Sequence, residues 1–199
     1  FNLVIFVSFF SYLSAPYLYD NEKLIVNIKN QLSENLNLDL NFSNDYKYNF
    51  FPRPNFEFKA DSFLNQTEGL GEIKVYISAQ HLLFPNKIEI KDVIFNKINF
   101  NLNKKNFNFF LNLLNKTFKD GNLIIKNSNI FFRNTNNEVL FINKILKMKY
   151  YYEPKELKNI FYSENEIFNV PFSLETFLGE DKNKIYSLIN LNLMKLKIE

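Results

Sequence analysis

The chain has 199 residues, 46% of them apolar, and its 24 basic and 21 acidic side chains leave a net charge of +3. This length suits one large domain or two small ones, and the apolar content is enough for a sizeable core. The charge is too weak and dispersed for a nucleic-acid-binding protein, because the sequence has no basic cluster and no RNA-binding motif. The absence of cysteine excludes disulfides, thiolate nucleophiles and cysteine-based metal sites.

The N-terminal segment, residues 1–19, has no charged side chain, and we interpret it as a transmembrane anchor. Its membrane-facing residues are predicted to be Leu3, Val4, Ile5, Phe6, Val7, Phe9, Phe10 and Leu13. Tyr12, Tyr17 and Tyr19 suit an aromatic belt at the membrane interface. A cleaved signal peptide and a buried core helix are the alternatives. Because the chain begins with Phe, we expect the span to extend upstream.

Residues 21–35 are predicted to form an amphipathic helix. Leu24, Ile28 and Leu32 recur at the spacing of one helical face, and Asn21 is a plausible N-cap. A second helix is expected over residues 106–118, ended by Asp120-Gly121.

Most of the remaining chain alternates apolar and polar residues, which is typical of strands with one buried face. Strands are predicted over residues 36–42, 46–51, 56–62, 72–79, 87–94, 97–103, 122–126, 129–133, 139–143, 146–152, 166–178 and 184–199. In the first half, the apolar positions that we assign to one face are Leu36, Leu38, Leu40, Phe56, Phe58, Ile73, Val75, Ile77, Ile88, Ile90, Ile98, Phe100 and Leu102. Two soluble helices are too few to cover so long a sheet. The apolar face must therefore line a groove, meet lipid or fold on itself.

No pattern of residues in the sequence indicates catalysis, and we expect no enzyme activity, no cofactor and no metal site. His81 is the only histidine and stands in a short corner beside Leu82, where a surface or capping role is typical. No nucleophile-elbow motif or glycine-rich phosphate loop is present.

Four sequence features carry a family resemblance. They are the apolar segment ending in Pro16-Tyr17-Leu18-Tyr19-Asp20, the helix that follows it, the bend Phe50-Phe51-Pro52-Arg53-Pro54, and the strands around the corner His81-Leu82-Leu83-Phe84. Together they resemble the N-terminal region of the AsmA family, inner-membrane-anchored periplasmic proteins of Gram-negative bacteria. Asn169-Val170-Pro171-Phe172 fits as a bend in a later long strand. The chain departs from the family in its low glycine and high asparagine content.

The resemblance implies a mainly β fold with a few helices. It would be a curved, taco-like antiparallel sheet over residues 20–199, continuing beyond 199, behind an N-terminal membrane helix and an amphipathic helix. It also implies a single-pass protein of the bacterial inner membrane with its bulk in the periplasm, contributing to outer-membrane biogenesis by carrying phospholipid along an apolar groove. The expected partners are membrane phospholipid and other envelope proteins, without nucleic acid.

Three alternatives stay open at this point. The sheet could curl until its own phenylalanines fill the inside. The protein could instead be an assembly factor that binds envelope proteins by edge-strand pairing, without lipid cargo. A fragment of an outer-membrane barrel is disfavoured by the anchor and by the helix at residues 21–35.

Overall fold

The computed structural model describes residues 2–36, 40–41, 45–60, 62–63, 67–68, 71–102, 121–179, 184–191 and 196–198. Its helices are α1 (Asn2–Ser14), the 3-10 turn η1 (Ala15–Leu18), α2 (Asn21–Leu36) and the 3-10 turn η3 (Pro85–Lys87). Its strands are β1 (Leu40–Asn41), β2 (Tyr46–Asn49), β3 (Asn55–Ala60), β4 (Ser62–Phe63), β5 (Thr67–Glu68), β6 (Gly71–Ile77), β7 (Ile90–Asn96), β8 (Asn99–Leu102), β9 (Asn122–Arg133), β10 (Val139–Glu153), β11 (Lys158–Ile167), β12 (Val170–Leu178), β13 (Ile185–Leu191) and β14 (Leu196–Ile198). The mainly β class predicted from the sequence is confirmed. The helix predicted over residues 106–118 lies outside the described residues.

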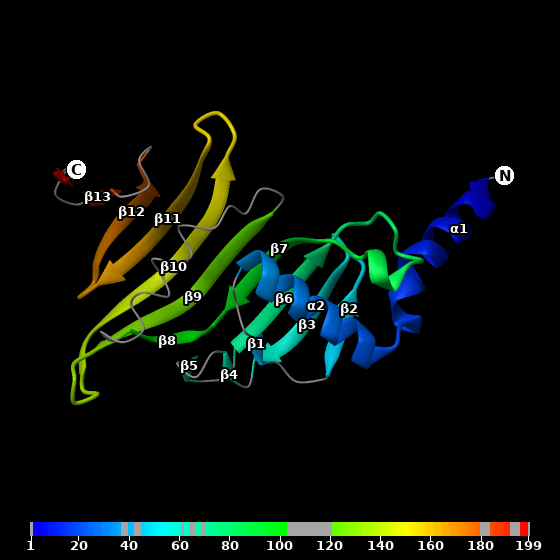
Figure 1. Cartoon of the computed structure of the whole chain (residues 1–199), viewed down its shortest axis with the longest axis horizontal. Coiled ribbons are helices and arrows are strands. Elements are labelled where there is room, and N and C mark those ends of the chain that lie inside the picture. The colour runs from blue at the N-terminus through cyan, green and yellow to red at the C-terminus, as the bar shows by residue number, and fades with distance from the viewer. Residues whose placement is uncertain are drawn as a thin grey trace.

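One large sheet organises the molecule. Among the described residues it has 12 strands, with the order β14-β13-β12-β11-β10-β9-β7-β6-β3-β2. Strand β8 also pairs with β9, and β5 pairs with β8. Figure 1 shows α1 projecting from the end of the molecule that carries β2, while β12 and β13 lie at the far end. The two termini are therefore at opposite ends of the sheet.

The second helix, α2, covers the first part of the sheet (Figure 1). Its apolar stripe consists of Leu24, Ile25, Ile28 and Leu32, all of which are buried. This confirms the predicted helix and its buried face. The cap differs from the prediction, because Asp20 rather than Asn21 accepts the backbone N–H groups of Glu22 and Lys23, at 3.1 and 3.2 Å.

The sheet is mixed rather than antiparallel, which corrects the predicted arrangement. Strands β7 and β8 both run parallel to β9, and they pair with successive parts of it. Both neighbours change course where the pairing passes from β7 to β8. Lys97, between β7 and β8, and Asn127, opposite it in β9, each have a left-handed backbone at this junction, with φ of 58° and 48°. Across it, the backbone N–H of Ile98 donates to Ser128 Oγ at 3.1 Å. Since β9 runs through this junction, the two short strands predicted over residues 122–133 are one.

Three further strand predictions in the second half were wrong. Strand β10 is a single strand that spans both predicted segments over residues 139–152. The expected bend in one long strand over residues 166–178 is instead a hairpin turn, at which Phe168 and Asn169 have φ of 51° and 62°. The strand predicted over residues 184–199 also divides, into the antiparallel pair β13 and β14. Strand β11 was predicted only in its last two residues.

Candidate membrane and lipid-binding surfaces

One apolar face runs across almost the whole sheet. The strand registers place in one row Phe58, Ile73, Phe95, Ile125, Met148, Ser163, Leu174 and Ile189. Directly paired residues project from the same side of a sheet. The continuous apolar side expected from the alternation therefore exists, and Ser163 is its one polar member in this row.

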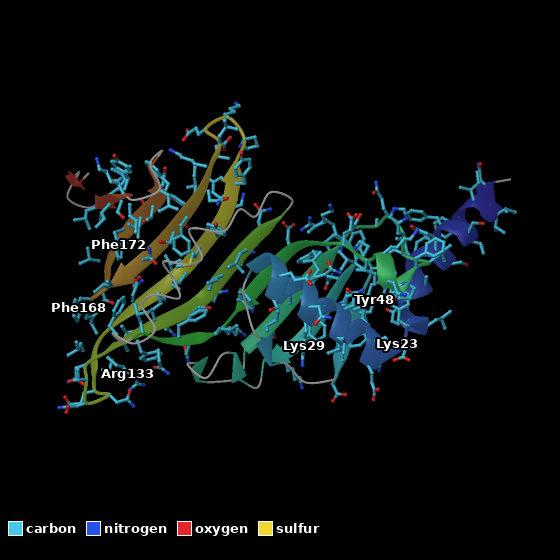
Figure 2. All side chains as sticks on the ribbon, in the orientation of Figure 1. Lys23, Lys29, Tyr48, Arg133, Phe168 and Phe172 are labelled. Atoms are coloured by element: carbon cyan, nitrogen blue, oxygen red, sulfur yellow. The ribbon has the colours of Figure 1, made fainter. Side chains whose placement is uncertain are left out.

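Exposure changes along this row. Phe58 and Ile73 have no exposed surface, because α2 packs on this half of the sheet, whereas Leu174 and Ile189 on β12 and β13 are half-buried. The same face on β11 and β12 also carries half-buried Phe161 and Phe172. Figure 2 shows Phe172 at the end of the sheet remote from α1 and Tyr48 at the other end. The partly open stretch of apolar face lies over β11, β12 and β13.

The residues that the sequence assigned to a lipid-facing groove are core residues in this structure. Those with described side chains are all buried: Phe56, Phe58, Ile73, Val75, Ile77, Ile88, Ile90, Ile98, Phe100 and Leu102. They belong to one cluster with the buried stripe of α2. The side chains of Leu36, Leu38 and Leu40 lie outside the described residues. For this half of the sheet, the alternative in which the protein's own side chains fill the inside describes the packing.

A buried polar group interrupts the partly open end of the face. Asn143 donates from Nδ2 to Asn165 Oδ1 at 3.3 Å, and Asn165 Nδ2 donates to Ser163 Oγ at 2.6 Å. Asn143 Oδ1 is buried and accepts no hydrogen bond. Next to this group, the hydroxyls of Thr176 and Ser187 are 3.2 Å apart. An acyl chain bound to this face would therefore contact apolar side chains and also a narrow strip of polar side chains, formed by Asn143, Asn165, Ser163, Thr176 and Ser187.

The first helix, α1, is the most exposed apolar element. Leu3, Val4, Ile5, Phe6, Val7, Phe9 and Phe10 are all exposed, as expected for residues that face lipid. Leu13 differs, because it is half-buried and packs against the core. The predicted anchor thus has an exposed apolar stretch, followed by a C-terminal end that packs on the domain. We call this end, residues 12–14, the foot of α1.

A set of tyrosine hydroxyls fixes the foot of α1. Tyr12 donates to the carbonyl of Ala79 at 2.8 Å and accepts the backbone N–H of Leu82 at 3.2 Å. Tyr19 donates to the carbonyl of Leu82. From the sheet, Tyr48 donates to the carbonyl of Leu13 at 2.8 Å. Two of the tyrosines that suggested an interfacial belt, Tyr12 and Tyr19, therefore hold the end of α1 and the turn after it to the β6–β7 corner, and Tyr48 holds α1 to β2.

Tyr48 is the buried member of this set of tyrosines. Only 3% of its surface is exposed. Burial raises the pKa of its hydroxyl, so the group remains a neutral hydrogen-bond donor at ordinary pH.

By length and composition, no single helix among the described residues could cross a bilayer. The two helical segments Asn2–Leu18 and Asn21–Glu34 are long and apolar enough for a membrane span only when taken together. The chain bends by 89° between them. Since the apolar stripe of α2 is occupied by the sheet, α1 is the member of this pair with a free apolar surface.

Two loops bring further exposed apolar side chains to the foot of α1. The ring of Phe50 packs edge-on against that of Phe10, with centroids 6.0 Å apart, and the next residue, Phe51, is 80% exposed. In the β6–β7 corner, Leu82 is buried whereas Leu83 and Phe84 are exposed. The sequence prediction named both loops only as bends. In each loop, two adjacent apolar residues directly before a proline could have indicated exposed apolar side chains. They are Phe50-Phe51 before Pro52 and Leu83-Phe84 before Pro85.

His81 lies exposed in this corner, with a left-handed backbone of φ 63°. Within the part of the chain that the structure describes, no group of three or more His, Cys, Asp or Glu side chains could hold a metal ion.

Comparison with known proteins adds no assignment. No protein-family model matches the chain, and no match was found among curated proteins.

Proposed function

We propose that this chain is a non-enzymatic, membrane-anchored β-sheet protein of the AsmA type, which carries phospholipid along the apolar face of its sheet. In this proposal α1 lies in the bacterial inner membrane, the sheet lies in the periplasm, and the protein serves outer-membrane biogenesis. The observation that carries the proposal is the apolar row that continues from the core under α2 to the half-buried Leu174 and Ile189.

The energetics favour an apolar ligand on this face. Each CH₂ group moved from water to an apolar surface contributes about 0.8 kcal/mol, so ten such groups would contribute about 8 kcal/mol before the cost of ordering the chain. Such binding depends on area and not on polar recognition. The candidate lipid-contacting residues are Phe161, Phe172, Leu174 and Ile189, in place of the residues that fill the core.

Lipid capture tests this proposal. The chain is purified in mild detergent, and bound phospholipid is extracted and quantified by mass spectrometry. Leu174→Glu places a carboxylate on the apolar face of the sheet, here called the inner face, and should lower the amount of bound phospholipid several-fold. The matched control is Leu188→Glu, since Leu188 is also half-buried but pairs with Glu175 on the opposite face.

Two results would count against lipid carriage. One is wild-type protein without phospholipid. The other is equal loss in both variants, which would indicate general unfolding or non-specific detergent effects. Far-UV circular dichroism of each variant separates loss of fold from loss of lipid.

The alternative function, edge-strand pairing with other envelope proteins, has one supporting observation. Among the described strands, β14 pairs only with β13, so this edge of the large sheet is open to another strand, whereas at the β2 edge the hydroxyl of Tyr17 donates to the Tyr48 carbonyl at 3.2 Å. Photo-crosslinking from β14 and from Leu174 separates the two functions. Protein adducts from the edge alone favour assembly, and lipid adducts from the inner face favour carriage.

A further inference from the structure

We infer that Leu18, Phe51, Leu83 and Phe84 form a docking rim around the foot of α1 that inserts into the interface of a phospholipid bilayer. This inference rests on the proposed membrane role of α1. It adds a second, peripheral contact that orients the sheet against the membrane surface.

The rim comes from three separate segments of the chain. Leu18 ends η1, Phe51 lies between β2 and β3, and Leu83 with Phe84 lies in the β6–β7 corner. Their exposed fractions are 89%, 80%, 60% and 54%. Large apolar side chains gathered from distant segments in this way are typical of an interaction surface rather than of scattered exposure.

Side-chain contacts place the two loops beside the last turns of α1. Phe50, next to Phe51, packs on Phe10. Tyr12 is hydrogen-bonded to Ala79 and Leu82, next to Leu83. Because α1 rises about 1.5 Å per residue, Phe10 and Tyr12 lie about 3 to 6 Å before its end at Ser14. The rim therefore lies alongside the end of the exposed apolar segment, where a membrane interface would fall.

Hydrogen bonds within the protein fix the position of the rim without any contact with a membrane. The hydroxyl of Tyr12 ties α1 to the β6–β7 corner, and that of Tyr19, just after η1, donates to the same corner. The hydroxyl of Tyr48 ties α1 to β2, whose end leads into the loop that carries Phe51. In the corner, the backbone N–H of Phe84 donates to the carbonyl of His81 at 2.8 Å, and Lys87 N–H donates to the carbonyl of Phe84 at 2.8 Å. A preorganised apolar surface loses little conformational entropy on insertion.

A bilayer fits this surface better than a protein partner does. The rim lies beside the end of an exposed apolar helix that has no charged residue, which is the chemistry of a lipid-inserted segment. Lys87 lies with Nζ 5.3 Å from the centre of the Phe84 ring, so an ammonium group stands beside the apolar tip. This pairing of an aromatic ring and a cation suits the boundary between acyl chains and phosphates.

The absence of cysteine makes a site-specific test direct. Single-cysteine variants Phe51→Cys and Phe84→Cys are labelled with an environment-sensitive fluorophore. They are reconstituted with vesicles of phosphatidylcholine and phosphatidylglycerol, with and without spin-labelled phospholipid as quencher. The matched control is Asn136→Cys, in the exposed β9–β10 turn at the end of the molecule away from α1 (Figure 1).

We expect the labels at 51 and 84 to shift to shorter emission wavelength and to be quenched at least twofold more than the label at 136. Flotation of the vesicles is measured on the same samples. If the chain floats but the labels at 51 and 84 stay unquenched, the rim is overturned and the anchor stands. If the chain does not float, the proposed membrane role of α1 fails, and the rim with it. Equal quenching at all three positions would also overturn the rim.

Discussion

The packing of α2 on the sheet yields a sharp prediction, because a closed core and an open groove respond differently to the loss of one side chain. Ile28 has no exposed surface and lies in the core cluster of the sheet's first half. Ile28→Ala removes three carbons from this core and should cost about 2–5 kcal/mol of folding free energy. For a chain of this size, 3 kcal/mol corresponds to a fall in melting temperature of about 6–12 °C.

Val26→Ala is the matched control, since Val26 stands on the same helix and is exposed. Both substitutions replace a β-branched residue by alanine, so their gains in helix propensity, about half a kcal/mol each, cancel in the comparison. Val26→Ala should change the stability by less than about 0.5 kcal/mol.

Urea unfolding in mild detergent, followed by circular dichroism, measures both variants. The assay is repeated after lipid has been removed and after it has been restored. Equal effects of the two substitutions would refute the closed packing of α2. A cost of Ile28→Ala that disappears when lipid is restored would also refute it, because an acyl chain would then fill the space beneath the helix.

Three further substitutions test other parts of the structure. Gly71→Ala should destabilise the chain by about 1–3 kcal/mol in urea unfolding, since the new Cβ would stand 3.2 Å from Ile98 Cδ1 and still closer to its Cγ1. In a double-mutant cycle with Ile98→Ala, which removes both of these atoms, the two losses should be less than additive, and additive losses would place the strain elsewhere. Tyr48→Phe removes the hydroxyl donated to Leu13 O and should cost about 1 kcal/mol. Hydrogen exchange should rise at residues 12–17 while the rest of the sheet is unchanged. Burial raises the pKa of Tyr150 above its ordinary value of 10.0, so the stability that its neutral hydroxyl contributes is complete below pH 10 and is lost as the pH rises beyond it. Tyr150→Phe should therefore reduce the fall in melting temperature at alkaline pH. An unchanged pH profile would contradict the conclusion that the buried Tyr150 hydroxyl contributes to this fall.

Local patterns predicted the elements where a single periodicity persisted. The spacing of Leu24, Ile28 and Leu32 identified α2 and its buried face. The alternation in Gly71–Ile77 corresponds to the strict buried and half-buried alternation of β6. These predictions succeeded because a helix or a strand with one covered face needs only the order of residues along the chain.

Turns and strand breaks were harder to predict. The hairpin at Phe168 and Asn169 contains no glycine, although both residues have a left-handed backbone. Glycine is the usual signal for such a turn, so its absence led to one long strand in place of two. The parallel pairing of β7 with β9 was also missed, because the apolar and polar alternation of a strand is the same in parallel and antiparallel pairs.

The sequence by itself determined the strand-rich class, the amphipathic α2 and the uncharged apolar α1, because each is a property of neighbouring residues. Only the tertiary structure decided which apolar faces are covered. Phe58 and Phe100 have the same alternating pattern as the half-buried Leu174, yet they are buried because α2 and distant strands pack around them. The rim is likewise a tertiary feature, since Tyr12 meets Leu82 across 70 positions of chain. Burial depends on contacts between distant segments, and periodicity along one segment carries no information about them.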